Sequence, residues 1–129
     1  MAAGQFVSTQ WLAVGGGAAL GAWVRWGLGI ALNASILPLG TLIANLGGGL
    51  LMGMAMAYFM NTAADNTLRL LIMTGFLGGL TTFSAFSAEA FNFLQKQQYA
   101  WAASHILSHV VGSLLMTAIG FMLVQYFRN

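Results

Sequence analysis

Long runs of apolar residues dominate the chain and are separated by short polar segments. The apolar runs cover residues 11–32, 39–60, 68–94 and 99–127. Each run is longer than the roughly 20 residues with which an α-helix crosses about 30 Å of hydrocarbon. The pattern therefore predicts an all-α integral membrane protein with four transmembrane helices, in a single domain that covers residues 1–129.

The polar segments between the runs contain residues that begin and end helices. Pro38, the only proline, can open the second helix, and Asp65 and Asn66 are N-cap candidates before the third. The first ten residues contain no Lys or Arg, so they lack the basic region of a secretory signal. We therefore expect the first helix to stay in the mature protein.

Composition supports the membrane assignment. Charged residues make up only 5% of the chain and hydrophobic residues 59%, whereas a soluble domain has about 25% charged residues. Lipid must therefore surround most of the surface. The net charge of +2 involves no cluster of Lys and Arg, which excludes binding to nucleic acid. Cysteine is absent, and no catalytic triad or phosphate-binding loop is present, so we expect no enzyme activity.

The basic residues are distributed evenly over the two ends of the predicted helices. Four spans put Arg69 and Arg128 on one side of the membrane and Lys96 on the other, where Arg25 joins it if its side chain extends outward from the first span. Because orientation follows an imbalance of Lys and Arg, the sequence predicts insertion in both orientations and an antiparallel homodimer. The alternative is that so small a count is balanced by chance.

Glycine is frequent, with 17 residues in the chain. Residues 17–21 and 49–53 each have small residues at both ends of a five-residue window. Such patterns let helix backbones approach closely. They predict tight helix packing, either within one subunit or between subunits.

The third apolar run combines glycines with hydroxyl residues near its middle. The set comprises Gly75, Gly78, Gly79, Thr81, Thr82, Ser84 and Ser87. Paired glycines weaken a helix, and hydroxyl groups compete for its backbone hydrogen bonds. We therefore expect the helix to break near residues 78–81, where freed carbonyl groups would be able to hold a cation. The alternative is a continuous helix with a glycine-rich packing face.

Two phenylalanines follow this segment and share one helix face. Phe83 and Phe86 are three residues apart, with Ser84 and Ser87 interleaved. The edge of an aromatic ring is positive. Ring edges and hydroxyl protons together can therefore solvate a small anion without offering an acceptor to a cation. The alternative is that both rings face lipid or the protein core.

Polar residues also recur along the second and fourth runs. They are Thr41 and Asn45 in the second run and His105, His109, Ser113 and Thr117 in the fourth, each set spaced by four residues. Polar groups in a bilayer tend to face the protein interior or water, so three polar strips predict a narrow hydrated path. The alternative is hydrogen bonding between helices. The histidine spacing fits two metal ligands, but no third ligand is nearby in the sequence, so the pattern does not favour a metal site.

The segment 78–87, Gly-Gly-Leu-Thr-Thr-Phe-Ser-Ala-Phe-Ser, resembles the signature of the Fluc (CrcB) fluoride channels. Further matches are Arg25-Trp26, Gly40-Thr41-Leu42 with Asn45, Gly112-Ser113 and Met116-Thr117-Ala118. The resemblance covers nearly the whole chain. Ala85 departs from it, because the family usually has Thr between the two phenylalanines.

The resemblance implies an antiparallel, dual-topology homodimer in the bacterial inner membrane. It implies passive export of fluoride down its electrochemical gradient through two pores, which relieves fluoride toxicity. Phe83 and Phe86 would flank the ion path, and Asn45, Ser113 and Thr117 would line its polar track. Arg25 would lie near the aqueous vestibule. The carbonyl groups of Gly78 and Thr81, from both subunits, would hold a structural, non-transported Na⁺.

Two other functions compete with a channel. A small multidrug-type, proton-coupled exporter is also a four-helix dimer of dual topology. It needs a carboxylate within the membrane, typically in the first helix, whereas Glu89 lies near the end of the third run. A non-transporting assembly subunit would have no use for three polar strips.

Overall fold

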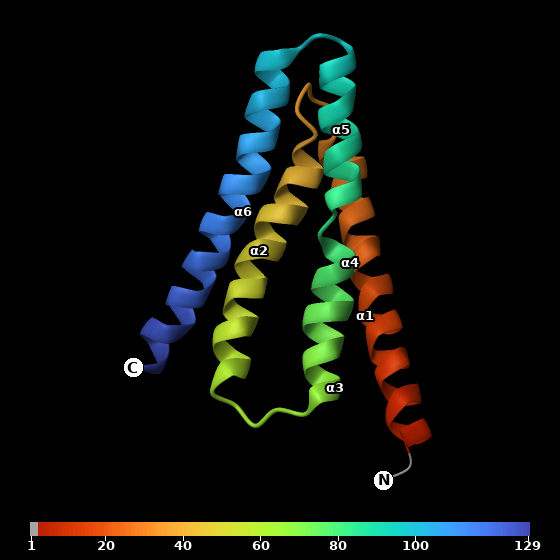
Figure 1. The fold of residues 1–129 in the computed structure, drawn as a ribbon, viewed down its shortest axis with the longest axis vertical. Coiled ribbons are helices and arrows are strands. Elements are labelled where there is room, and N and C mark those ends of the chain that lie inside the picture. Colours follow the sequence, from red (N-terminus) through yellow and green to blue (C-terminus); the bar gives the residue numbers. More distant parts are fainter. Residues whose placement is uncertain (1–2) are drawn as a thin grey trace.

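The chain folds into long helices joined by short connections (Figure 1). The structure, a computed structural model, describes residues 3–129, with side chains from residue 8 onward. Residues 1 and 2 lie outside the described residues. They belong to the predicted domain and to the N-terminal segment without Lys or Arg. The elements are α1 (Ala3–Leu32), α2 (Leu39–Met60), α3 (Asn66–Arg69), the π-helix η1 (Leu70–Leu77), α4 (Gly78–Leu80), α5 (Phe83–Gln95) and α6 (Tyr99–Arg128).

Within the described residues, three helical stretches are long and apolar enough to cross a membrane. They are Leu39–Met60, Asn66–Gln95 and Tyr99–Arg128, and they identify a multi-pass membrane protein. Helix α1 has 30 residues but carries Arg25 and several glycines, and it is not among the three. A fourth membrane crossing by α1 therefore stays a prediction. Pro38 occupies the position before α2, as expected.

The third stretch is broken, as predicted, but not at its glycines. Helices α3, η1 and α4 continue into one another up to Leu80. Thr81 (φ −84°, ψ 154°) and Thr82 (φ −149°, ψ 119°) are then extended, and α5 starts at Phe83. Gly78 and Gly79 stay helical, so the break lies at the end of the expected range.

The glycines before the break pack against α1. A Cβ on Gly75 would lie 2.9 Å from the Val14 carbonyl oxygen, and one on Gly79 would collide with the carbonyl of Ala18. The small residues at 17–21 form the other side of this contact. A glycine-rich packing face therefore exists together with the break, and it explains why these glycines stay helical: the contact with α1 outweighs their weak helix propensity.

The second small-residue pattern joins α2 to α6. A Cβ on Gly53 would collide with the carbonyl of Thr117, and one on Gly120 would collide with the carbonyl of Leu50. Both predicted patterns thus pack helices within one chain. The two close contacts hold α1 beside the first part of the third stretch and α6 beside α2.

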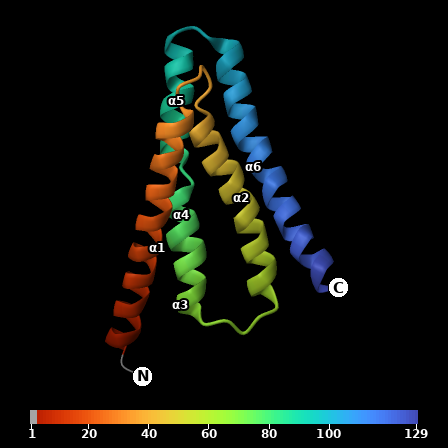
Figure 2. The same ribbon diagram turned by 180° about the vertical axis from the view of Figure 1, so that it is seen from behind.

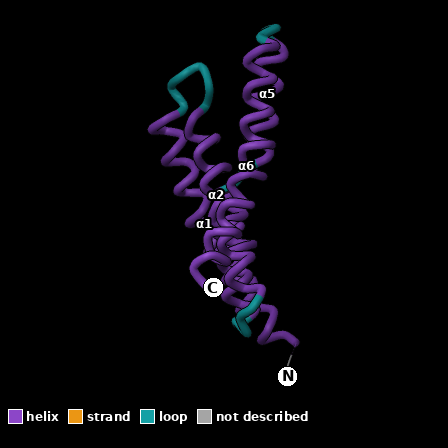
Figure 3. The backbone as a smooth tube through the Cα atoms, turned by 90° about the vertical axis from the view of Figure 1, so that its left-hand side faces the viewer, coloured by secondary structure: helices purple, strands orange, loops and turns teal. Residues whose placement is uncertain are grey.

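The connections gather at two ends of the molecule. The α1–α2 loop and the α5–α6 turn lie at one end, and the α2–α3 loop and the C-terminus lie towards the other (Figures 1 and 2). Seen from the side, the α1–α2 loop and the tip of α5 diverge at the first end (Figure 3). The helix break therefore lies between the part of the molecule in which α1 packs closely on η1 and α4 and the end at which α5 and the α1–α2 loop lie apart (Figure 3).

Candidate functional site: a cavity at the helix break

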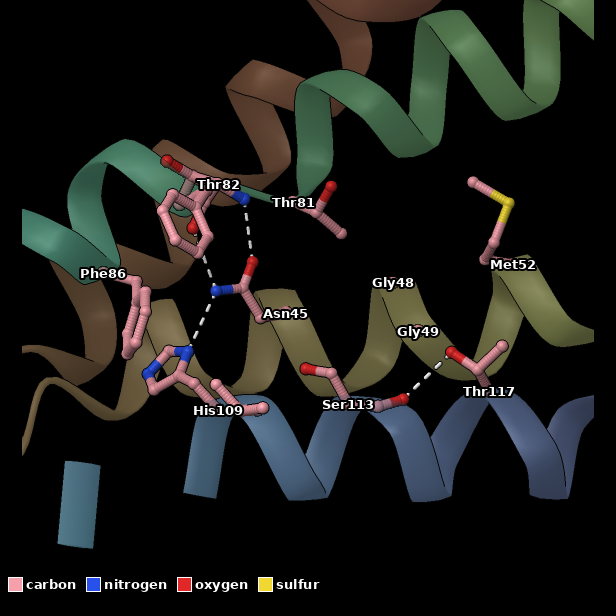
Figure 4. Close-up of a pocket in the computed structure, with 12 residues that line it drawn as sticks. Asn45, Gly48, Gly49, Met52, Thr81, Thr82, Phe86, His109, Ser113 and Thr117 are labelled. Carbon is pink, nitrogen blue, oxygen red and sulfur yellow. Dashed lines mark hydrogen bonds between the residues drawn. The ribbon is translucent and has the colours of Figure 1, made fainter. Parts of the chain in front are cut away.

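A cavity of about 390 Å³ lies beside the break in the third stretch. It is walled by α2, by the two threonines of the break, by the start of α5 and by α6 (Figure 4). Its lining is mostly neutral and includes Asn45, Thr81, Thr82, Phe83, Phe86, His109, Ser113 and Thr117. Five of the seven residues predicted for the fluoride path thus meet at one cavity.

Asn45 holds the break in its extended conformation. Its Oδ1 accepts a hydrogen bond from the Thr82 N–H at 2.7 Å, and its Nδ2 donates to the Thr82 carbonyl at 3.0 Å. The Asn45 side chain therefore gives the Thr82 N–H the partner that it would have in a continuous helix, and it adds a donor to the Thr82 carbonyl, which as the N-cap carbonyl also accepts the first hydrogen bond of α5. Nδ2 also lies 2.9 Å from Nδ1 of His109, which connects the break to α6.

Thr82 also caps α5. Its Oγ1 accepts a hydrogen bond from the Ala85 N–H at 3.1 Å, which is the geometry of an N-cap. The first N–H groups of a helix have no carbonyl partner one turn earlier, and they form the positive end of its dipole. Because Thr82 and Phe83 line the cavity, this positive end begins at the cavity wall.

The two predicted phenylalanines form an edge-to-face pair. Their ring centroids are 5.4 Å apart at an interplanar angle of 63°. Phe86 is buried and packs against His109, with centroids 4.7 Å apart, whereas Phe83 is 76% exposed. Phe86 is thus a buried ring that also lines the cavity and touches the polar strip of α6, so the structure brings it to the place that the predicted ion path requires.

The predicted hydroxyl residues divide into two groups. Ser113 and Thr117 line the cavity, and the Thr117 hydroxyl donates to the Ser113 carbonyl at 2.9 Å. Ser84 and Ser87 do not line it. Ser84 is exposed, and its hydroxyl lies 3.3 Å from that of Thr82.

The residues predicted for the vestibule and for sodium lie around the end of α4. Arg25 donates from Nε to the Gly79 carbonyl at 3.0 Å, so it braces α4 and does not line the cavity. In a continuous helix the Gly78 carbonyl would accept from the Thr82 N–H, but that group donates to Asn45. Thr81 lies outside both helices. The carbonyl groups of Gly78 and Thr81 are thus both released from regular helix bonding.

A buried polar cluster beside the cavity was not predicted as a unit. Thr41 donates to Glu89 Oε1 at 2.7 Å, and Glu89 Oε2 lies 3.2 Å from His105 Nε2. The sequence placed no third ligand near the two histidines, but the fold brings Glu89 to them. The signal available in the sequence was the carboxylate itself, because an ionisable residue within a span needs a partner or a function.

The fold and the cavity define a multi-pass membrane protein with a site at a helix break. Comparison with known proteins identifies its family. Residues 12–121 match the family model described as CrcB-like protein, Camphor Resistance (CrcB). The chain belongs to the CrcB-like family.

Curated relatives are similar over most of their length. The chain is 56% identical over 121 residues to a protein of Aromatoleum aromaticum, covering 92% of each chain. It is 55% identical over 117 residues to a protein of Nitrosospira multiformis, covering 88% of this chain and 91% of the relative. A third relative, from Acinetobacter baylyi, is 44% identical over 117 residues, which cover 89% and 93% of the two chains. All three relatives are named fluoride-specific ion channel FluC.

Proposed function

We propose that this chain forms a fluoride-specific ion channel that exports fluoride passively down its electrochemical gradient and so relieves fluoride toxicity. The identity of the ion rests on the names of relatives more than 50% identical to it. The observation that carries the proposal within this chain is the Asn45 clamp. It keeps a helix break open beside Phe83 and Phe86, in a cavity with no Lys, Arg, Asp or Glu among its described lining residues.

The chemistry of this cavity suits a small anion that must move on. Fluoride is strongly hydrated, so it needs several donors when it leaves water. The hydroxyl of Ser113 and the ring edges of Phe83 and Phe86 supply positive character without a formal charge. Asn45 contributes by holding the break open, because its two N–H groups donate to the Thr82 carbonyl and to His109. Conduction requires several weak sites, and a fixed cation in the path would hold the ion too tightly.

The proposed assembly is an antiparallel homodimer of dual topology with two pores, in which each subunit crosses the bacterial inner membrane four times. Arg69 and Arg128 lie towards one end and Lys96 towards the other, while Arg25 binds the Gly79 carbonyl beside the break. So small an imbalance of basic residues supports both orientations. The exposed ring of Phe83, directly beside the buried ring of Phe86, supports a second subunit at this flank.

A structural Na⁺ at the dimer centre completes the proposal. Carbonyl oxygens are ordinary ligands for such a cation, and those of Gly78 and Thr81 are released from helix bonding by the Asn45 clamp and the Thr82 cap. Gly78 is exposed, so its carbonyl region is accessible to a second subunit. If this site holds sodium, prolonged removal of Na⁺ should reduce activity or dissociate the dimer. Full activity in sodium-free buffer would remove the site from the proposal.

The channel is tested by fluoride efflux from liposomes that contain the purified protein, measured with a fluoride electrode. We expect fast fluoride release and no chloride release from matched vesicles loaded with chloride. Absence of fluoride release from folded protein at known density would refute the proposal. The proton-coupled exporter is not favoured, because Glu89 is engaged by Thr41 and lies beside His105.

A further inference from the structure

The buried cluster of Glu89, His105 and His109 is not needed for the channel function proposed above. Glu89 comes from α5 and the two histidines from α6. One ligand atom from each residue lies within 4.8 Å of the other two. His105 is only 2% exposed and His109 only 4%. The cluster therefore brings together two buried imidazoles and one carboxylate, whose side chain is 20% exposed.

Three atoms of this cluster lack hydrogen bonds. Glu89 Oε2, His105 Nε2 and His109 Nε2 are all buried and have no hydrogen-bond partner among the described residues. Glu89 Oε2 and His105 Nε2 face each other at 3.2 Å, within the distance of an ion pair. Buried polar atoms need partners, and a cation that binds all three atoms would provide a shared one.

We propose that Glu89, His105 and His109 form a binding site for a divalent transition-metal ion of the zinc type. Two histidines and one carboxylate are a common zinc ligand set, with a fourth position left for water. A tetrahedral site with metal–nitrogen distances of about 2.1 Å requires ligand atoms about 3.4 Å apart. The Glu89–His105 pair already has this separation, and His109 is close enough to reach it by a small side-chain adjustment.

The surroundings hold the ligands in orientation. Thr41 donates to Glu89 Oε1 at 2.7 Å, which leaves Oε2 for the metal. The rings of Phe86 and Phe93 pack on His105, with centroids at 5.4 and 5.6 Å. Contacts of this kind to the outer side of a ligand fix its geometry. A separate cavity of about 330 Å³ reaches Glu89 from the end where α5 and α6 are joined, and it provides a path of entry.

The tautomer of His109 connects this site to Asn45. The orientation of the Asn45 amide is fixed, since Oδ1 accepts from the Thr82 N–H and Nδ2 donates to the Thr82 carbonyl. Nδ2 must therefore donate to Nδ1 of His109, and the neutral ring carries its proton on Nε2. To bind a metal, Nε2 releases this proton to solvent and Nδ1 takes one up, so Nδ1 can no longer accept from Asn45. Metal occupancy thus breaks the Asn45–His109 hydrogen bond.

Metal binding itself is the first test. We would titrate Co²⁺ into dimeric protein that carries no histidine tag and follow the visible bands of four-coordinate Co²⁺, then displace it with Zn²⁺. We expect one ion per chain, and at least about 100-fold weaker binding in Glu89→Gln and His105→Gln, more than a change in an outer contact causes. Asp65→Asn, which alters the exposed carboxylate before α3, should bind as the unsubstituted protein does.

Two results would overturn the proposal. One is the absence of saturable Co²⁺ or Zn²⁺ binding to the unsubstituted protein, a result that does not depend on whether any variant folds. The other is equal binding by the unsubstituted protein and by Glu89→Gln and His105→Gln variants that elute as the same dimer.

The coupling to Asn45 has its own test, which rests on the proposed channel function. Zn²⁺ should slow fluoride efflux through the unsubstituted protein at the concentration at which it binds, and should not slow efflux through a conducting His105→Gln variant. Zinc that binds without any change in efflux would disprove the coupling while the metal site stands. Absence of fluoride efflux in zinc-free buffer would instead contradict the proposed function.

Discussion

The two halves of the third helical stretch are held in different ways. Before the break, η1 and α4 lie against α1 through glycines, with backbone touching backbone (Figure 1). After the break, α5 is positioned by side chains: Asn45 and Thr82 fix its start, and Glu89 joins it to Thr41 and His105. The first half is fixed by shape, and at Gly75 and Gly79 it tolerates no added atom. The second half is fixed by hydrogen bonds, which binding of an ion or a proton can replace.

The largest expected effect comes from adding a methyl group to the first half. In Gly79→Ala the new Cβ would overlap the Ala18 carbonyl, and neither backbone can yield easily. We expect a loss of stability of about 3 kcal/mol, the upper end of the usual cost of overpacking, measured as lost recovery of folded protein and a lower unfolding temperature in detergent. Gly15→Ala is the matched control, because a Cβ there meets nothing within 4 Å. Similar behaviour of the two variants would disprove the close contact.

The next largest effect concerns the clamp in the second half. Asn45→Ala leaves the Thr82 N–H without a partner, at about 1–3 kcal/mol, and removes one of the two donors to the Thr82 carbonyl. We expect fluoride efflux to fall at least about a hundredfold, while the chain still folds because the glycine contacts with α1 are unchanged. Asn92→Ala, on the exposed side of α5, should keep normal efflux. If Asn45→Ala conducts normally, the clamp is not part of the path.

A smaller effect is expected at the aromatic pair. Phe83→Ile and Phe86→Ile keep apolar volume but remove the positive ring edge. Each should reduce fluoride efflux by about tenfold without loss of assembly. Phe91→Ile replaces a phenylalanine that is 59% exposed on the same helix and serves as the control. Unchanged efflux in both test variants would exclude the rings from the path.

The smallest effect concerns the cap of α5. Thr82→Ala removes the oxygen that accepts from the Ala85 N–H and should lower stability by about 1 kcal/mol. Thr82→Ser retains that oxygen and should behave as the unsubstituted protein does. Thermal unfolding in detergent measures both, and a loss of equal size in the two variants would point to packing of the methyl group instead.

The long helices were predictable because apolar runs of that length leave few alternatives. The second run, residues 39–60, coincides with α2, and α6 ends one residue beyond the predicted fourth run. The first helix begins earlier than predicted, at Ala3. Its polar residues Gln5, Ser8, Thr9 and Gln10 interrupt the apolar pattern but do not prevent helix formation.

The position of the break was less predictable than its existence. Gly78 and Gly79 have weak helix propensity, and that argument placed the break at them. In the fold, α1 stabilises Gly79 in the helix, and Asn45 holds Thr82 outside it. Both α1 and Asn45 are distant in sequence from the break, so local helix propensity could not show that Gly79 stays helical and that Thr82 does not. Local sequence patterns also did not predict that Glu89 lies beside the two histidines, because this contact depends on how the turn between α5 and α6 packs the two helices together.

The π-helix η1 sets the rotational register of everything that follows it. A π-helix has one residue more in each hydrogen-bonded turn than an α-helix. Leu71, Gly75 and Gly79, which are spaced by four residues, accordingly all face α1. If the same eight residues, Leu70–Leu77, formed ordinary α-helix, each would turn the chain further than it does in the wider π-helix, and the downstream segment would be rotated about the helix axis. Thr82 would then point away from Asn45 while every residue of the signature remained in place. The π-helical geometry of the apolar segment Leu70–Leu77 thus determines the site as much as the polar residues that form it.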